Sequence, residues 1–133
     1  MSQTDALIVE TAAGPQALDD MAAALNRAWS ENPHVPDDVR IHMDIAVAEI
    51  GANIVEHAAP GRIRCEVRVV TGQIRVDLFD DGRPTDVDLN AARLPDDLAE
   101  RGRGLALAKA VLAKLSYGRD PENHWTLVSR SFS

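Results

Sequence analysis

The sequence predicts an α+β sandwich, in which a mixed, largely antiparallel sheet carries its helices on one face. Two long segments place apolar residues three and four positions apart, which is typical of amphipathic helices. Two shorter segments alternate apolar and polar residues on either side of a tight turn, which is typical of a β-hairpin. The predicted order is strand, helix, helix, hairpin, long loop, helix and strand.

The N-terminal part provides the first strand and two helices. Residues 6–11 form a β-prone run, and Pro15 suits the first turn of the next helix, which Asn32 ends. Asp37 is a suitable N-cap for the second helix, which stops at Ala59. The apolar stripes of these helices are Leu18, Met21, Ala22, Leu25, Ala28 and Trp29, then Val39, Met43, Ala46, Ile50 and Ile54.

The hairpin covers residues 63–69 and 74–80, joined by a turn at 71–73. Asp80 continues the inward alternation of the second strand, so a carboxylate points toward the apolar side at the strand's end. Buried carboxylates need hydrogen-bond donors, which a ligand amino group, a backbone amide or a water could supply. The alternative interpretation is an ordinary turn at Asp81-Gly82 that opens a loop, since Asp-Gly pairs are common in turns.

The C-terminal part begins with a polar stretch from Asp81 to Glu100, long enough to be a lid, with a helical turn near 88–93. A turn at 118–123 and a last strand at 125–132 end the chain. The helix between them has apolar residues at helical spacing: Leu105, Ala108, Val111, Leu112 and Leu115.

Composition excludes several classes of protein. A chain of 133 residues and 14.4 kDa predicts one domain, residues 1–133. A net charge of −7 argues against nucleic-acid binding, which needs clustered positive charge. Cys65 is the only cysteine, so no disulfide can form within the chain. The sequence has no long apolar run and no signal peptide, and we expect a cytoplasmic protein without a membrane span.

Glu49, Asn53 and His57 follow one another at four-residue steps on the second predicted helix. A step of four rotates a side chain by only about 40° around a helix, so all three line one edge. A carboxylate beside an amide at this edge predicts a proton acceptor next to a metal ligand. A solvated helix edge would show the same spacing.

Arg101-Gly102-Arg103-Gly104 opens the third predicted helix. Exposed amides at a helix N-terminus favour anions, and glycines let a phosphate approach the backbone. The stretch is not a P-loop, because no Gly-Lys-Ser/Thr follows, and a flexible hinge is the alternative interpretation.

The order of these motifs resembles the GHKL ATPase superfamily (Bergerat ATP-binding fold), which includes histidine kinases, gyrase B, Hsp90 and MutL. Glu49-x-x-x-Asn53 comes first, then Asp80-x-Gly82, a lid, and Gly102-x-Gly104 at a helix start. The resemblance covers nearly the whole chain and is most specific around Glu49. The short length favours one branch, the anti-sigma-factor serine kinases of bacterial partner-switching modules.

The resemblance implies a role for each motif residue. Glu49 matches the general base, and Asn53 matches the amide that holds Mg²⁺ against the ATP phosphates. Asp80 matches the carboxylate that accepts a hydrogen bond from the adenine amino group, and Gly82 matches the glycine beside it.

The later motifs match less specifically. Gly102 and Gly104 match the second glycine box, and Arg101 or Arg103 matches an arginine that reaches the terminal phosphate. Thr126 stands where the family often has a threonine near the adenine.

Two positions depart from the family pattern. Arg83-Pro84 replaces the end of the first glycine box, which predicts a stiffer hinge and an altered nucleotide affinity. The glycine that usually precedes the last-strand threonine is absent, and the sequence there is His124-Trp125-Thr126.

The resemblance therefore implies a single ATP-binding kinase domain that transfers phosphate from Mg-ATP to a serine of a STAS-type anti-sigma-factor antagonist. It also implies a sigma factor as second partner, and a homodimer. The alternative of another class is a nucleotide-dependent binding module without turnover. The detached ATPase half of a histidine kinase is a third, weaker reading.

Overall fold

A computed structural model describes residues 6–58, 61–82, 103–119 and 121–133. Most of the predicted lid, with its helical turn at 88–93 and Pro84, lies outside the described residues. So do Arg101 and Gly102 of the second glycine motif, and nothing is described of the Arg103 side chain.

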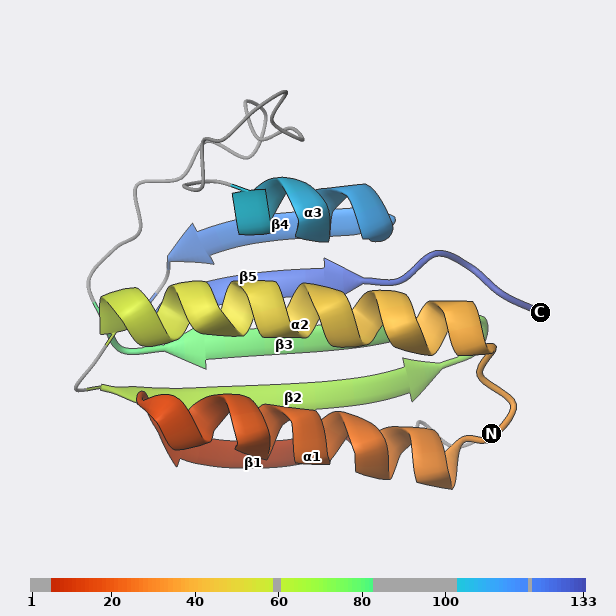
Figure 1. Cartoon of the computed structure of the whole chain (residues 1–133), viewed down its shortest axis with the longest axis horizontal. Coiled ribbons are helices and arrows are strands. Elements are labelled where there is room, and N and C mark those ends of the chain that lie inside the picture. The colour runs from red at the N-terminus through yellow and green to blue at the C-terminus, as the bar shows by residue number, and fades with distance from the viewer. Residues whose placement is uncertain (1–5, 59–60, 83–102, 120) are drawn as a thin grey trace.

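The described residues form one five-stranded sheet with three helices on one face (Figure 1). The sheet order is β1-β2-β3-β5-β4, and every neighbouring pair is antiparallel. This arrangement confirms the predicted α+β sandwich. The elements are β1 (Leu7–Ala12), α1 (Pro15–Glu31), α2 (Asp37–Ala58), β2 (Arg62–Val70), β3 (Gln73–Asp80), α3 (Arg103–Val111), β4 (Lys114–Arg119) and β5 (Asn123–Val128).

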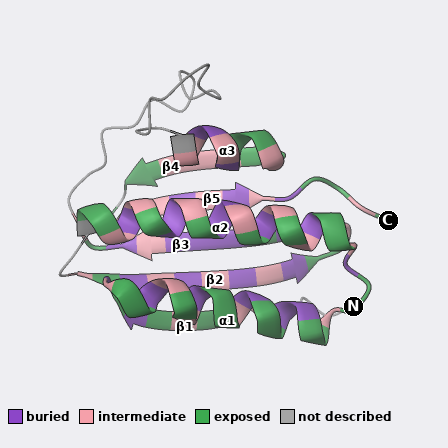
Figure 2. Cartoon of the chain, in the orientation of Figure 1, coloured by how far each residue is buried: buried purple, intermediate pink, exposed green. Residues whose placement is uncertain are grey.

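The core lies between the sheet and the helices. Figure 2 shows buried residues along both the helices and the strands of the sheet. The two long helices pack closely at Gly51 of α2. A Cβ added to this glycine would come within 2.8 Å of Met21 Cε on α1, so a larger residue would force the helices or Met21 to shift. The largest fully buried side chains include Met21, Leu25, Met43, Ile50, Ile63, Ile74, Leu78, Trp125 and Leu127.

The C-terminal elements differ from the prediction. We predicted a helix that includes Leu115 and a turn at 118–123, but α3 ends at Val111 and residues 114–119 form β4. Leu112 and Leu115 fit a helical period, yet Leu115 also lies directly opposite Leu127 of β5. Pairing with β4 satisfies backbone groups of β5 that would otherwise form an exposed edge, and this tertiary gain outweighs the local helical pattern.

The last strand also begins earlier and ends earlier than predicted. It starts at Asn123 and ends at Val128. Beyond it, the backbone amides of Ser129 and Phe132 still donate to the carbonyls of Ile74 and Gly72, so the tail follows the start of β3. Gly72 has φ of 79°, which explains a glycine in this turn.

None of the helices in the described ranges is long and apolar enough to span a membrane.

Candidate functional site

A buried polar cluster lies at the end of β3. Asp80 is 4% exposed, and one of its oxygens, Oδ1, accepts two hydrogen bonds. The donors are the Gly82 backbone amide at 2.9 Å and Asn123 Nδ2 at 2.8 Å. The inward direction predicted for Asp80 is therefore correct, and Gly82 lies beside it as expected.

Asn123 holds this cluster together from β5. Its Nδ2 also donates to the Gly82 carbonyl at 3.1 Å, and its Oδ1 accepts from the Tyr117 hydroxyl at 2.6 Å. Sequence reasoning missed Asn123, because we placed it in a turn. The alternation of Asn123, Trp125 and Leu127 could have revealed it, since all three are buried and face the helices.

Thr126 does not join this cluster. It lies directly opposite Asp77, whereas Asp80 pairs with Asn123, and the two positions on each strand are three residues apart, which is an odd offset. Successive side chains alternate between the two faces, so Thr126 is on the face away from the helices. Its hydroxyl donates to Asp77 at 3.3 Å, and a contact with a base beside Asp80 would have to pass through the sheet.

The helix-edge residues lie on the helical layer. Glu49 and Asn53 are half-buried on α2, and His57 is exposed one turn later. A Cβ on Gly104, in the first turn of α3, would come within 2.5 Å of Glu49 Oε1. The structure therefore brings the predicted base and the second glycine motif into contact, and a side chain at Gly104 would displace the carboxylate.

Three elements end together at one side of the molecule. Figure 1 shows the C-terminal ends of α2 and β3 and the start of α3 on the same side. Gly104 lies against the helix edge at Glu49, and β3 ends at Asp80 on the same side of the molecule, so these residues define the candidate region.

The residues in this region fit a magnesium nucleotide. Asp80 makes no hydrogen bond through Oδ2 to the described residues, so this oxygen can accept one from an amino group. Asn53 offers an amide oxygen, a ligand type that Mg²⁺ prefers. The described residues contain no cluster of three or more His, Cys, Asp or Glu side chains suited to a metal. Phosphate oxygens and waters would complete the coordination of a magnesium ion held by Asn53.

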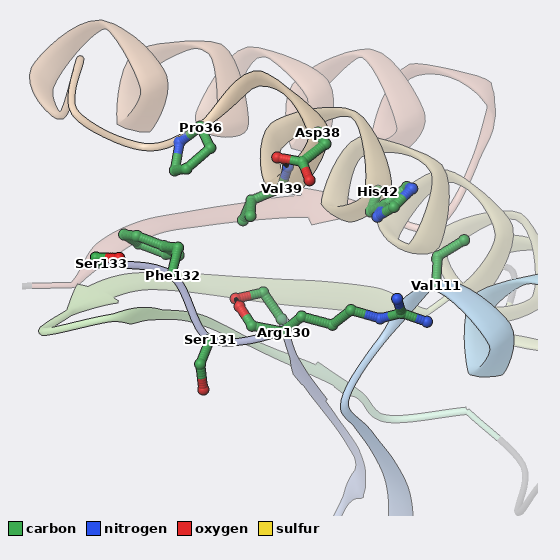
Figure 3. Close-up of a pocket in the computed structure, with 10 residues that line it drawn as sticks. Pro36, Asp38, Val39, His42, Val111, Arg130, Ser131, Phe132 and Ser133 are labelled. Carbon is green, nitrogen blue, oxygen red and sulfur yellow. Dashed lines mark hydrogen bonds between the residues drawn. The ribbon is translucent and has the colours of Figure 1, made fainter.

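A separate cavity of about 380 Å³ lies at the other end of the molecule. Figure 3 shows it between the first turns of α2, which carry Val39 and His42, and the tail with Arg130 and Phe132. None of the predicted site residues that the structure describes lines it.

Comparison with solved structures finds the same fold in several proteins. A structure of the RsbU and RsbW domains of Rv1364c from Mycobacterium tuberculosis matches with a TM-score of 0.65 and 19% identity, over 96% of this chain and 33% of that one. The histidine kinase domain of the blue-light activated kinase EL346 from Erythrobacter litoralis matches with a TM-score of 0.55 and 23% identity, over 84% and 61%. The chain thus spans less than two thirds of either protein.

The catalytic domain of the histidine kinase ThkA matches over 94% of this chain and 97% of its own length, with a TM-score of 0.56 and 13% identity. No curated protein matches the chain in sequence. The family model described as "Histidine kinase-like ATPase domain" matches residues 11–129. This chain therefore belongs to the family of histidine kinase-like ATPase domains, which implies that it binds ATP.

Proposed function

We propose that this chain is an ATP-dependent protein serine kinase that also acts as an anti-sigma factor. One observation carries the catalytic part: the Glu49 carboxylate, one turn from Asn53, lies against Gly104 at the start of α3. This contact supports the proposal that Glu49 accepts a proton next to helix amides, which favour phosphate. The sequence resemblance to anti-sigma-factor kinases and the fold likeness to a structure with an RsbW domain support the finer assignment.

The reaction is phosphoryl transfer to a serine. The serine hydroxyl oxygen attacks the γ-phosphorus, the bond to the β–γ bridging oxygen breaks, and ADP leaves. Glu49 accepts the proton that the serine loses. Asn53 would contribute an oxygen ligand to Mg²⁺, and the bound ion would neutralise part of the phosphate charge.

The remaining residues position the nucleotide. Asp80 accepts a hydrogen bond from the adenine amino group, with Gly82 fixed beside it. Gly102 and Gly104 let the phosphates approach the backbone, and Arg101 or Arg103 contacts the terminal phosphate.

The proposed substrate is a STAS-type antagonist of the anti-sigma factor. Phosphorylation adds about −1.5 to −2 charges at the contact. The kinase itself carries a net charge of −7, so the modified antagonist is repelled and dissociates. The freed chain then binds its second partner, which we propose is a sigma factor. We further propose that it works in the cytoplasm as a homodimer.

The test uses the proteins that co-purify with the chain. Each is incubated with the wild-type chain, magnesium and γ-labelled ATP, and the labelled residue is mapped by mass spectrometry. Phosphoserine on a small partner supports the kinase. Partner exchange that requires ATP but leaves no label on any partner would overturn the kinase in favour of the nucleotide-dependent binding module.

A further inference from the structure

Among the described residues, Asp80 accepts hydrogen bonds through Oδ1 alone. Asn123 Nδ2 and the Gly82 amide both donate to Oδ1, at 2.8 and 2.9 Å. Among the described residues, the single fully enclosed side-chain nitrogen or oxygen without a partner is Trp125 Nε1. Within the described ranges, Asp80 Oδ2 therefore has no hydrogen bond and is not fully enclosed, which leaves it available to a ligand.

Asn123 has one possible orientation in this network. Both atoms in reach of its Nδ2, a carboxylate oxygen and the Gly82 carbonyl, can only accept hydrogen bonds. Its Oδ1 accepts from the Tyr117 hydroxyl at 2.6 Å. A flipped amide would place its oxygen against two acceptors, so the Tyr117 hydroxyl and Asp80 together fix the direction of the amide.

Tyr117 is itself held in place from β5. Its ring contacts the Trp125 ring, with centroids 4.7 Å apart, and the two residues lie directly opposite each other on β4 and β5. Trp125 is 1% exposed. The hydroxyl of Tyr117 thus projects from an anchored ring, which gives the Asn123 amide a fixed partner.

We infer that Tyr117 and Asn123 are positioning residues that set the choice of nucleobase by fixing the rotamer of Asp80. This inference rests on the adenine site of the proposed function and extends it to residues outside the nucleotide contact. A locked Oδ2 only accepts, so it selects bases with an amino group at this position and repels a carbonyl oxygen. Because the Asn123 amide is fully engaged, it cannot turn its Nδ2 toward such an oxygen.

The test compares ATP with inosine triphosphate, which has a carbonyl oxygen where adenine has its amino group. Calorimetry gives the two dissociation constants for wild type, Tyr117→Phe and Asn123→Ala. We expect the wild type to prefer ATP. The ratio of the two constants should fall about tenfold or more in Asn123→Ala, since hydrogen bonds to charged groups are worth that much. In Tyr117→Phe it should fall by a smaller factor.

Ser129→Ala is the matched control. Ser129 is also buried in the sheet and accepts a hydrogen bond from the Ile74 amide, but at the opposite end of β3. Ser129→Ala should lower the melting temperature without changing the ratio of the two dissociation constants. A ratio that stays unchanged in Tyr117→Phe and Asn123→Ala, while ATP still binds, overturns this inference alone. A folded wild type that binds neither nucleotide overturns the proposed function and this inference together.

Discussion

Two carboxylates on β3 have nearly equal burial and opposite surroundings. Asp77 is 3% exposed and Asp80 is 4% exposed, and each meets partners on β5. Asp77 faces away from the helices, and both of its oxygens are engaged, by Arg75 at 3.0 and 3.2 Å and by His124 at 2.7 Å. Asp80 faces the helices and is bonded through one oxygen by neutral donors.

The difference separates a structural carboxylate, Asp77, from Asp80, the carboxylate that we propose binds the nucleotide. Burial raises the pKa of Asp77, but the hydrogen bonds from Arg75 and His124 outweigh it and lower the pKa below its usual value. Arg68 adds a further ion pair at 3.5 Å. Both oxygens of Asp77 already accept hydrogen bonds within the protein, so Asp77 has no free acceptor for a ligand. Among the described residues, none donates to Oδ2 of Asp80, so this oxygen can accept a hydrogen bond from a ligand.

Of the changes to these two carboxylates, we expect Asp80→Asn to have the largest effect on ATP affinity. The amide still accepts a hydrogen bond but loses the negative charge, and such charge-assisted bonds contribute about 1.5–3 kcal/mol. ATP affinity should fall by roughly one to two orders of magnitude, as measured by calorimetry. Equal affinity in wild type and variant would remove Asp80 from the binding site.

Asp77→Asn is the matched change on the other face of the same strand. We expect the free energy of unfolding to fall by about 1–2 kcal/mol, because the arginines are partly exposed and regain water. ATP affinity should stay within twofold of wild type. If Asp77→Asn weakens ATP more than Asp80→Asn does, the two roles are assigned the wrong way round.

Acid should destabilise the fold through Asp77 without requiring any ligand. Its pKa is lower in the folded than in the unfolded chain, so its contribution is present above the unfolded value of about 3.9 and is lost as pH falls through the folded value. Urea denaturation between pH 6 and pH 2 should show a smaller acid loss for Asp77→Asn. Parallel curves for variant and wild type would contradict this linkage.

Alkali gives the smallest expected effect, at Cys65. Burial raises the pKa of this thiol to about 12. Above the unfolded value of about 8.5 the unfolded chain releases the proton first, so stability should decline as pH rises. Cys65→Ala should remove this decline while lowering stability at neutral pH, measured by thermal melts from pH 7 to 10. A decline that persists in Cys65→Ala would assign it to another group.

Asp80 and Thr126 show how far sequence could predict the site. The inward direction of Asp80 followed from alternation along one strand, which is a local property. Thr126 depended on the register of β5, and register is set by pairing with β3 and β4. The predicted helix extended to Leu115 and the predicted turn covered 118–123, so we did not predict β4. We therefore placed the start of the last strand too late and assigned Asn123 to the turn.

The helix edge followed from local spacing in the same way. Glu49 and Asn53 lie on α2 as predicted, but the contact of Glu49 with Gly104 joins residues far apart in the sequence. No periodicity encodes that contact; it requires α2 and α3 to pack on the same sheet face.

Glu49→Gln tests whether Glu49 is the base of the proposed phosphoryl transfer. Glutamine keeps the shape of the side chain but cannot take up the serine proton at neutral pH. Single-turnover transfer of labelled phosphate to the antagonist should slow by a factor of about 10²–10⁴, while ATP affinity changes little. Transfer at the wild-type rate in Glu49→Gln would contradict the account and leave Glu49 a residue that only packs against Gly104.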